Sequence, residues 1–150
     1  MNNVISNLFK YYSRFVPKES LKEIFIQPEH SRRAGYSEIE AEIMGSDNKS
    51  VIPEIERFIL SVNENFVSEK IKNFNGIILF VEYGKHSIDH SVMKGIKELL
   101  SITVARNFSD ANNDNLNEIL LMNQCLEILE RIIRTMYEEQ NGPDFCANGE

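Results

Sequence analysis

The residues most capable of chemistry are two histidines and an aspartate within one short segment, His86, Asp89 and His90. On a helix, His86 and His90 would share one face a turn apart and, with Asp89 beside them, could bind a divalent metal ion. On a strand the two histidines would be about 13 Å apart, at about 3.3 Å per residue, which is too far to share one ion. These three residues are therefore candidate metal ligands only if the segment is helical.

Two glycines bracket this segment and favour a hairpin arm or loop. Gly84 and Gly95 lie about equally far from its middle and would face each other across a long hairpin. The alternative of a helix over residues 86–95 stays open. In a hairpin, Lys85 and His86 would lie near the tip, where they could contact a partner.

Other catalytic patterns are missing from the sequence. Ser87 has no G-x-S-x-G elbow around it, and no glycine-rich nucleotide loop is present. The two cysteines, Cys125 and Cys146, make neither a disulfide framework nor a zinc motif. The sequence therefore assigns no catalytic residue and no cofactor.

The composition is that of one globular domain. The 150 residues are 42% apolar and 26% charged, so a single domain over 1–150 can bury a core without disulfides, with 143–150 as a flexible tail. A net charge of -7 with dispersed basic residues argues against nucleic-acid partners. The longest apolar run, 77–81, is too short to cross a bilayer, and no secretory signal begins the chain. We expect a cytoplasmic protein with no membrane partner.

Hydrophobic periodicity predicts a helical first half of the chain. We expect a helix over 3–15 and another over 53–64, where apolar residues recur at helical spacing after Pro53. A short helix over 66–74 follows. Residues 37–44 fit a half-buried strand by strict alternation but also a capped helical turn, so both interpretations stay open.

The second half is predicted to be strands followed by a long helix. Five apolar residues in a row indicate a central strand over 77–83, and residues 99–108 are its expected antiparallel partner. A helix over 115–140 ends before Gly142 and Pro143. The predicted fold is α+β, with a small antiparallel sheet packed against the long C-terminal helix.

The long helix is more apolar than one buried face requires. Residues at spacings of three and four form one stripe, and further apolar residues widen it. Burial within the chain is the favoured explanation for the excess, and a second subunit is the alternative. The residues that we assign to an interface on the surplus flank are Leu121, Ile128 and Ile132.

The element order over 53–140 resembles small phage tail-terminator and head-to-tail connector proteins. The likeness includes the strand from Gly76 to Tyr83, the hairpin, the strand from Ser101 to Ala105 and the long helix opened by residues 113–118. The resemblance implies a ring-forming structural protein without catalytic residues, located in the assembled virion. The larger helical N-terminal third departs from the pattern, as does the lack of a further strand after the long helix.

The sequence thus leads to three hypotheses. The first is a non-enzymatic structural or interaction protein, whose partners are proteins and include copies of itself as a homo-oligomer. The alternative is a small metal-dependent hydrolase or sensor that uses His86, Asp89 and His90. The third is a regulator that binds one partner protein through its acidic surface.

Overall fold

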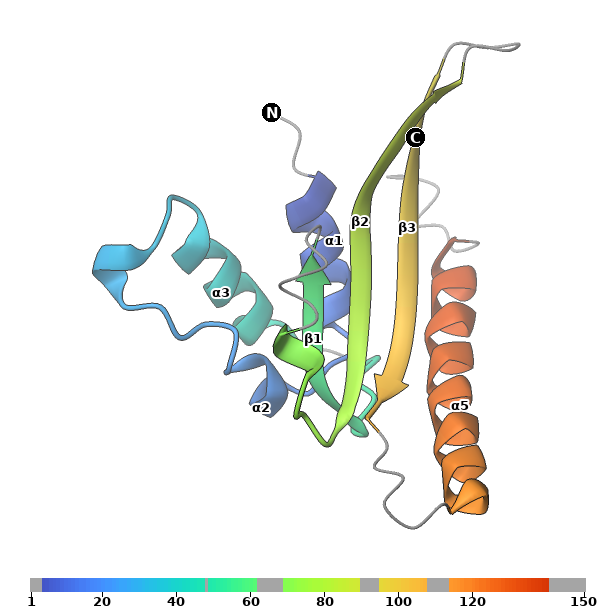
Figure 1. The fold of residues 1–150 in the computed structure, drawn as a ribbon. Coiled ribbons are helices and arrows are strands. Elements are labelled where there is room, and N and C mark those ends of the chain that lie inside the picture. Colours follow the sequence, from blue (N-terminus) through green and yellow to red (C-terminus); the bar gives the residue numbers. More distant parts are fainter. Residues whose placement is uncertain (1–3, 48, 62–68, 90–94, 108–113, 141–150) are drawn as a thin grey trace.

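The computed structural model describes residues 4–47, 49–61, 69–89, 95–107 and 114–140, with the backbone alone over 84–99. Three strands form one sheet in the order β1-β2-β3. Helices precede the sheet in the sequence, and one long helix follows it (Figure 1). The predicted α+β class and the long C-terminal helix are confirmed. The elements that the structure bounds are α1 (Val4–Ser13), α2 (Lys18–Leu21), η1 (Glu29–Ser31), α3 (Tyr36–Gly45), β1 (Ile55–Ser61), β2 (Ile77–Asp89), β3 (Gly95–Arg106) and α5 (Asn115–Gln140).

The sheet is mixed, because the central strand β2 has one parallel and one antiparallel neighbour. β3 pairs with β2 in antiparallel register, with Leu79 opposite Val104. β1 lies on the other side of β2 and runs parallel to it, with Phe58 opposite Leu79. The predicted central strand and its antiparallel partner are therefore confirmed, and the sheet gains a strand that the sequence did not predict.

The predicted helix over 53–64 is wrong, because residues 55–61 form β1. The register between β1 and β2 shifts between Ile55 and Arg57, which is a bulge at Glu56. The bulge puts Ile55 and Phe58 on the same face of the sheet although they are three residues apart, as they would be on a helix. The Glu56 carboxylate accepts a hydrogen bond from the backbone N–H of Ile77 at 2.9 Å, which ties the bulge to the start of β2.

The segment that allowed two interpretations, 37–44, is helical. It lies within α3, which starts after Gly35 with its left-handed backbone (φ 93°). The helix buries Ile43 and half-buries Ile39 one turn earlier, while Glu40 and Glu42 form ion pairs with residues outside it. The helical interpretation is therefore confirmed, but the helix begins before Ser37 and has no side-chain cap.

One face of the sheet carries the main core. Side chains from all three strands pack there against α1, the segment that follows it, and α5. Tyr12, Phe15 and Val16 are buried at the end of α1, and Ile128 and Ile132 are buried from α5. The opposite face has a smaller cluster, in which Ile71 and Phe74 cover Ile59 and Ile78. This two-sided burial explains why β1 and the start of β2 lack alternating polar residues.

The hairpin of β2 and β3 is longer than the rest of the sheet. β1 pairs with β2 only as far as Glu82, whereas β3 follows β2 to Asp89. The two strands continue beyond the body of the molecule as a ribbon (Figure 1). Gly84 lies at a register shift, and Gly95 pairs with Asp89, so the two glycines do not face each other as the sequence predicted. Residues 90–94 and the predicted tail 143–150 lie outside the described residues.

Candidate interaction surface

Two of the three candidate metal ligands, His86 and Asp89, lie on a strand. The backbone of His86 pairs with Glu98, and that of Asp89 pairs with Gly95, so both belong to the antiparallel ladder of β2 and β3. Three residues along a strand span about 10 Å, and the helical spacing on which the metal hypothesis depends is not formed here. His90 lies outside the described residues. Among the side chains that the structure describes, no group of three His, Cys, Asp or Glu could hold one ion.

Most charged side chains with described partners join one element to another. The Arg14 guanidinium of the α1 segment binds the Glu139 carboxylate of α5, and Lys10 pairs with Glu42 of α3 at 3.0 Å. Four of the described pairs, drawn from across the fold, are Arg14–Glu139, Lys10–Glu42, Arg32–Glu40 at 2.7 Å and Arg131–Glu54 at 3.2 Å. These contacts hold the helices around the sheet.

A cavity of about 470 Å³ lies beside β1 and is lined by Arg57, whose guanidinium is already bound by neighbouring groups. Arg57 pairs with Glu23 at 2.8 Å and donates to the carbonyl oxygen of Lys70 at 2.8 Å. Its guanidinium also lies 3.9 Å from the centre of the Phe74 ring. The arrangement fastens the segment after α2 to the sheet and leaves little donor capacity for a ligand.

The described groups with shifted pKa values are held in their protonated forms. Burial raises the pKa of Tyr12 to about 12, and the Tyr12 hydroxyl lies 3.7 Å from the Met136 sulfur. Burial, followed by a hydrogen bond to Glu139, also raises the pKa of Tyr11. Burial raises the pKa of Cys125 despite the opposing charge of Arg106. A reactive cysteine needs the opposite shift.

The inner face of α5 is not the one that the sequence favoured. Ile128 and Ile132 are 2% and 0% exposed, respectively, and belong to the main core, while Leu121 is half-buried. This corrects the assignment of Ile128 and Ile132 to a surplus flank, because the main core covers them within the chain, whereas Leu121 lines a groove between α5 and β3. Lys85 and His86, the other predicted interface residues, lie in β2 where the structure describes the backbone alone.

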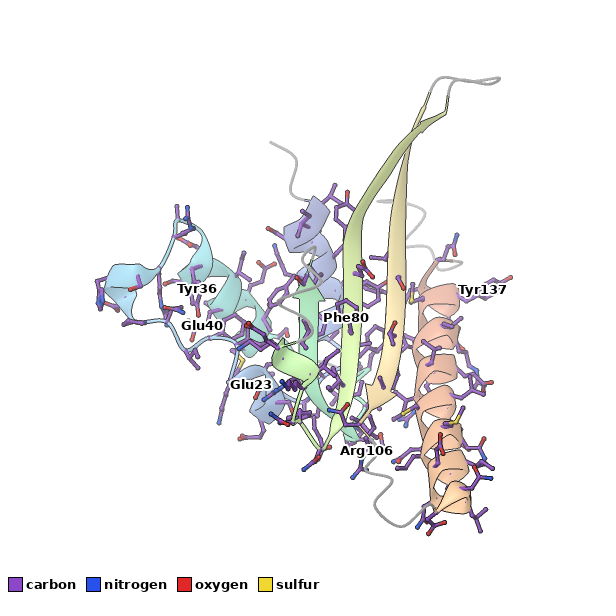
Figure 2. The ribbon with its side chains drawn as sticks, viewed as in Figure 1. Glu23, Tyr36, Glu40, Phe80, Arg106 and Tyr137 are labelled. Atoms are coloured by element: carbon purple, nitrogen blue, oxygen red, sulfur yellow. The ribbon has the colours of Figure 1, made fainter. Side chains whose placement is uncertain are left out.

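The outer face of α5 holds the surplus apolar surface. Of the ten large apolar side chains that the structure describes as exposed, seven belong to this one helix. Figure 2 shows Tyr137, which is 68% exposed, pointing away from the body of the molecule. The seven are Leu116, Ile119, Leu120, Met122, Leu126, Ile133 and Tyr137.

Six residues of α5 form a heptad stripe that we call the outer seam. Its members recur at alternating spacings of three and four, the pattern by which two helices pack in a coiled coil. Four are exposed and two are half-buried, and one of the half-buried pair, Met136 at the end of the stripe, also contacts the main core beside Tyr12. At 3.6 residues per turn the outer seam lies about 100° around the helix from the buried face. The six are Ile119, Met122, Leu126, Leu129, Ile133 and Met136.

A groove of about 520 Å³ separates the outer seam from β3. Val104, Ala105 and Arg106 form its strand side. Met122, Leu126 and Leu129 are among the residues of its helix side, and the lower end of β3 is marked by Arg106 in Figure 2. The apolar surface therefore extends from α5 to the edge of the sheet.

The sequence contains the signal for this surface, because the 3-and-4 spacing of the outer seam was visible in it. Periodicity alone could not tell which stripe faces the sheet, because the apolar residues of the helix spread over more than one face. That choice depends on the positions of α1 and the strands.

The sequence matches no protein-family model, and no curated protein or solved structure is significantly similar to the chain. Within the described part of the chain, no helix is both long and apolar enough to span a bilayer.

Proposed function

We propose that this chain is a non-enzymatic interaction protein, which serves as a protomer of a protein assembly and docks another protein molecule on the outer face of α5. The observation that supports this function is the concentration of exposed apolar side chains on that one helix. Monomeric proteins rarely expose large contiguous apolar patches, and such patches mark sites of association.

The size of the surface is sufficient for association. The seven side chains, each exposed by 44% to 68%, present roughly 800 Å² of surface if a fully exposed large side chain presents about 200 Å². A stable interface of standard size buries about 800 Å² per partner, so the exposed area on α5 is large enough for a specific contact.

The long β2–β3 ribbon gives the proposal a second feature. It extends past the pairing limit of β1 and away from the core (Figure 1). A projecting ribbon of this kind suits contact with a neighbouring molecule. A structural role in a virion, as in the phage connector proteins that the sequence resembles, is the specific form of assembly that this arrangement would serve.

Site-specific photo-crosslinking in cells tests the proposal. A photoreactive amino acid at Met122 or Tyr137, both exposed on α5, should give adducts of defined mass with a protein partner. The same group at Lys22, whose side chain is 62% exposed at the end of α2, is the matched control and should give none. The adducts should disappear when Leu126→Glu places a charge in the middle of the face.

Three results would contradict the proposal. The first is an absence of adducts at both α5 positions, and the second is equal labelling at Lys22. The third is adduct formation that Leu126→Glu leaves unchanged, since a specific apolar contact cannot accommodate a lone carboxylate at its centre.

A further inference from the structure

We infer that the partner of α5 is a second copy of this chain, bound so that the two α5 helices lie antiparallel along their outer seams with the β3 edges side by side. The inference rests on the proposed function and names the partner of that same surface. A two-fold pair needs one patch that is complementary to itself, so that residue i contacts j and j contacts i.

The outer seam has this self-complementarity. When the two helices run in opposite directions about an axis near residues 127 and 128, each seam residue meets an apolar seam residue of the second copy. Leu126 faces Leu129, Met122 faces Ile133, and each contact occurs twice. Ile119 likewise faces Met136, so the seam is apolar along about 25 Å at 1.5 Å per residue.

The residues flanking the seam fit the same pairing. On the side away from the sheet, Leu116 would face Tyr137 of the second copy, which covers the two most exposed of the apolar side chains on α5. Asn123 would face Glu130, which pairs an amide with a carboxylate.

The sheet allows the two bodies to stand side by side. β3 is an edge strand, since in the described residues it pairs with β2 alone. α5 contacts β3, and its outer seam is turned about 100° from the face that packs on the sheet. The α5 helix of a second copy can therefore pack on the outer seam beyond the edge of β3. The remaining elements of the two copies then lie on opposite sides of the helix pair.

The groove between α5 and β3 becomes the sheet side of the interface. It is lined by seam residues together with Val104 and Ala105, so filling it extends the apolar contact to the strand edge. The six exposed side chains in this contact, which are the seven without Leu120, present roughly 700 Å² per copy, close to the about 800 Å² per partner of a stable interface of standard size. The exposed apolar area on α5 is thus close to what each subunit of a stable dimer buries.

Light scattering on the full chain tests the pairing. The wild-type chain should have twice the 17.3 kDa mass of one copy. Met122→Glu and Ile133→Lys should each weaken dimerisation more than about tenfold, because a lone charge would be desolvated in the seam. The side chains at both positions are more than half exposed, so the fold is retained, and circular dichroism confirms this. Glu127→Lys, on the same helix but outside the seam, is the control and should remain dimeric.

The double variant Met122→Glu/Ile133→Lys distinguishes the arrangement. In the antiparallel pair each new glutamate faces a new lysine of the second copy, so the dimer should return. In a parallel pair like charges would face each other, and the double variant would stay monomeric.

Each contrary outcome overturns the inference. A wild-type chain that is monomeric at every concentration removes the second copy as partner, as does a dimer that both single variants leave intact. A double variant that stays monomeric removes the antiparallel arrangement. If the wild-type chain is monomeric and Tyr137 still crosslinks to a different protein in cells, this inference fails while the proposed function stands.

Discussion

Two adjacent isoleucines on α5 allow a direct test of which face of the helix is buried. Ile132 is fully buried in the main core, whereas Ile133 is 51% exposed on the outer seam. The same substitution at both positions, Ile132→Ala and Ile133→Ala, removes the same atoms from neighbouring residues of one helix. The sequence interpretation placed Ile132 on the surplus flank. It therefore does not predict that Ile132→Ala destabilises the fold more than Ile133→Ala.

The expected difference follows from burial. Truncating a fully buried isoleucine to alanine costs about 2–5 kcal/mol, because transfer free energy is lost and a cavity remains. At Ile133 about half of the side chain is already in water, so the lost burial is about 1 kcal/mol. The higher helix propensity of alanine offsets about 0.4 kcal/mol of that loss. We therefore expect Ile132→Ala to lower the free energy of unfolding by about 1.5–4 kcal/mol more than Ile133→Ala.

Urea denaturation measures both values. The two variants are made in the Met122→Glu background, so that association does not contribute to the unfolding free energy. The slope of the free energy against urea should stay the same, since both chains expose a similar surface on unfolding. Equal losses for the two variants, or a larger loss at Ile133, would refute the assignment of the inner and outer faces of α5.

Three further perturbations have defined outcomes. Gly76→Ala should lower stability by about 1–3 kcal/mol in thermal unfolding, because its methyl group would lie 2.2 Å from the Glu56 carboxylate oxygen that holds the bulge; an unchanged melting temperature would contradict this. The Tyr12 phenol has its folded pKa raised from 10.0 to about 12, so its contribution to stability is complete below pH 10 and is lost as the pH rises toward 12; stability that rises across this window would contradict the burial of Tyr12. In a Cys146→Ser chain, Cys125 should react with an alkylating reagent more slowly than a free thiol at mildly alkaline pH, because burial raises its pKa, and it should react at the free rate in urea.

The elements that the sequence predicted well are those with one dominant local signal. The five apolar residues from Ile77 to Val81 are covered on both faces of the sheet. An unbroken apolar run of this length is typical of a central strand, so the strand could be predicted. The helix from Asn115 to Gln140 keeps one period for its whole length, so it too could be identified.

The missed strand shows where periodicity fails. β1 contains Phe58 and Ile59, which are adjacent and buried on opposite faces of the sheet. The bulge at Glu56 also shifts the phase of the strand by one residue. Together these effects produce the i, i+3, i+4 spacing of a helix. Only the parallel pairing with β2, a contact distant in sequence, decides between the two structures.

The candidate interaction surface could be predicted in part. The heptad spacing from Ile119 to Met136 is a local property, and the sequence displays it. Which apolar stripe remains exposed depends on the core, where Ile128 and Ile132 meet side chains that are distant in sequence. The metal hypothesis required helical spacing of its ligands. His86 and Asp89 instead belong to the β2–β3 ladder, whose pairing is also a contact between residues distant in sequence.

The ribbon formed by the ends of β2 and β3 has a consequence for the cooperativity of the fold. From Gly84 to Asp89 the ladder has two strands, while from Ile77 to Glu82 β1 adds a third. An isolated two-stranded ribbon is only marginally stable in water. Its amide protons should therefore exchange through local opening, well before those of the three-stranded part. The distal end of the ribbon can thus open locally while the three-stranded centre of the sheet keeps its native packing.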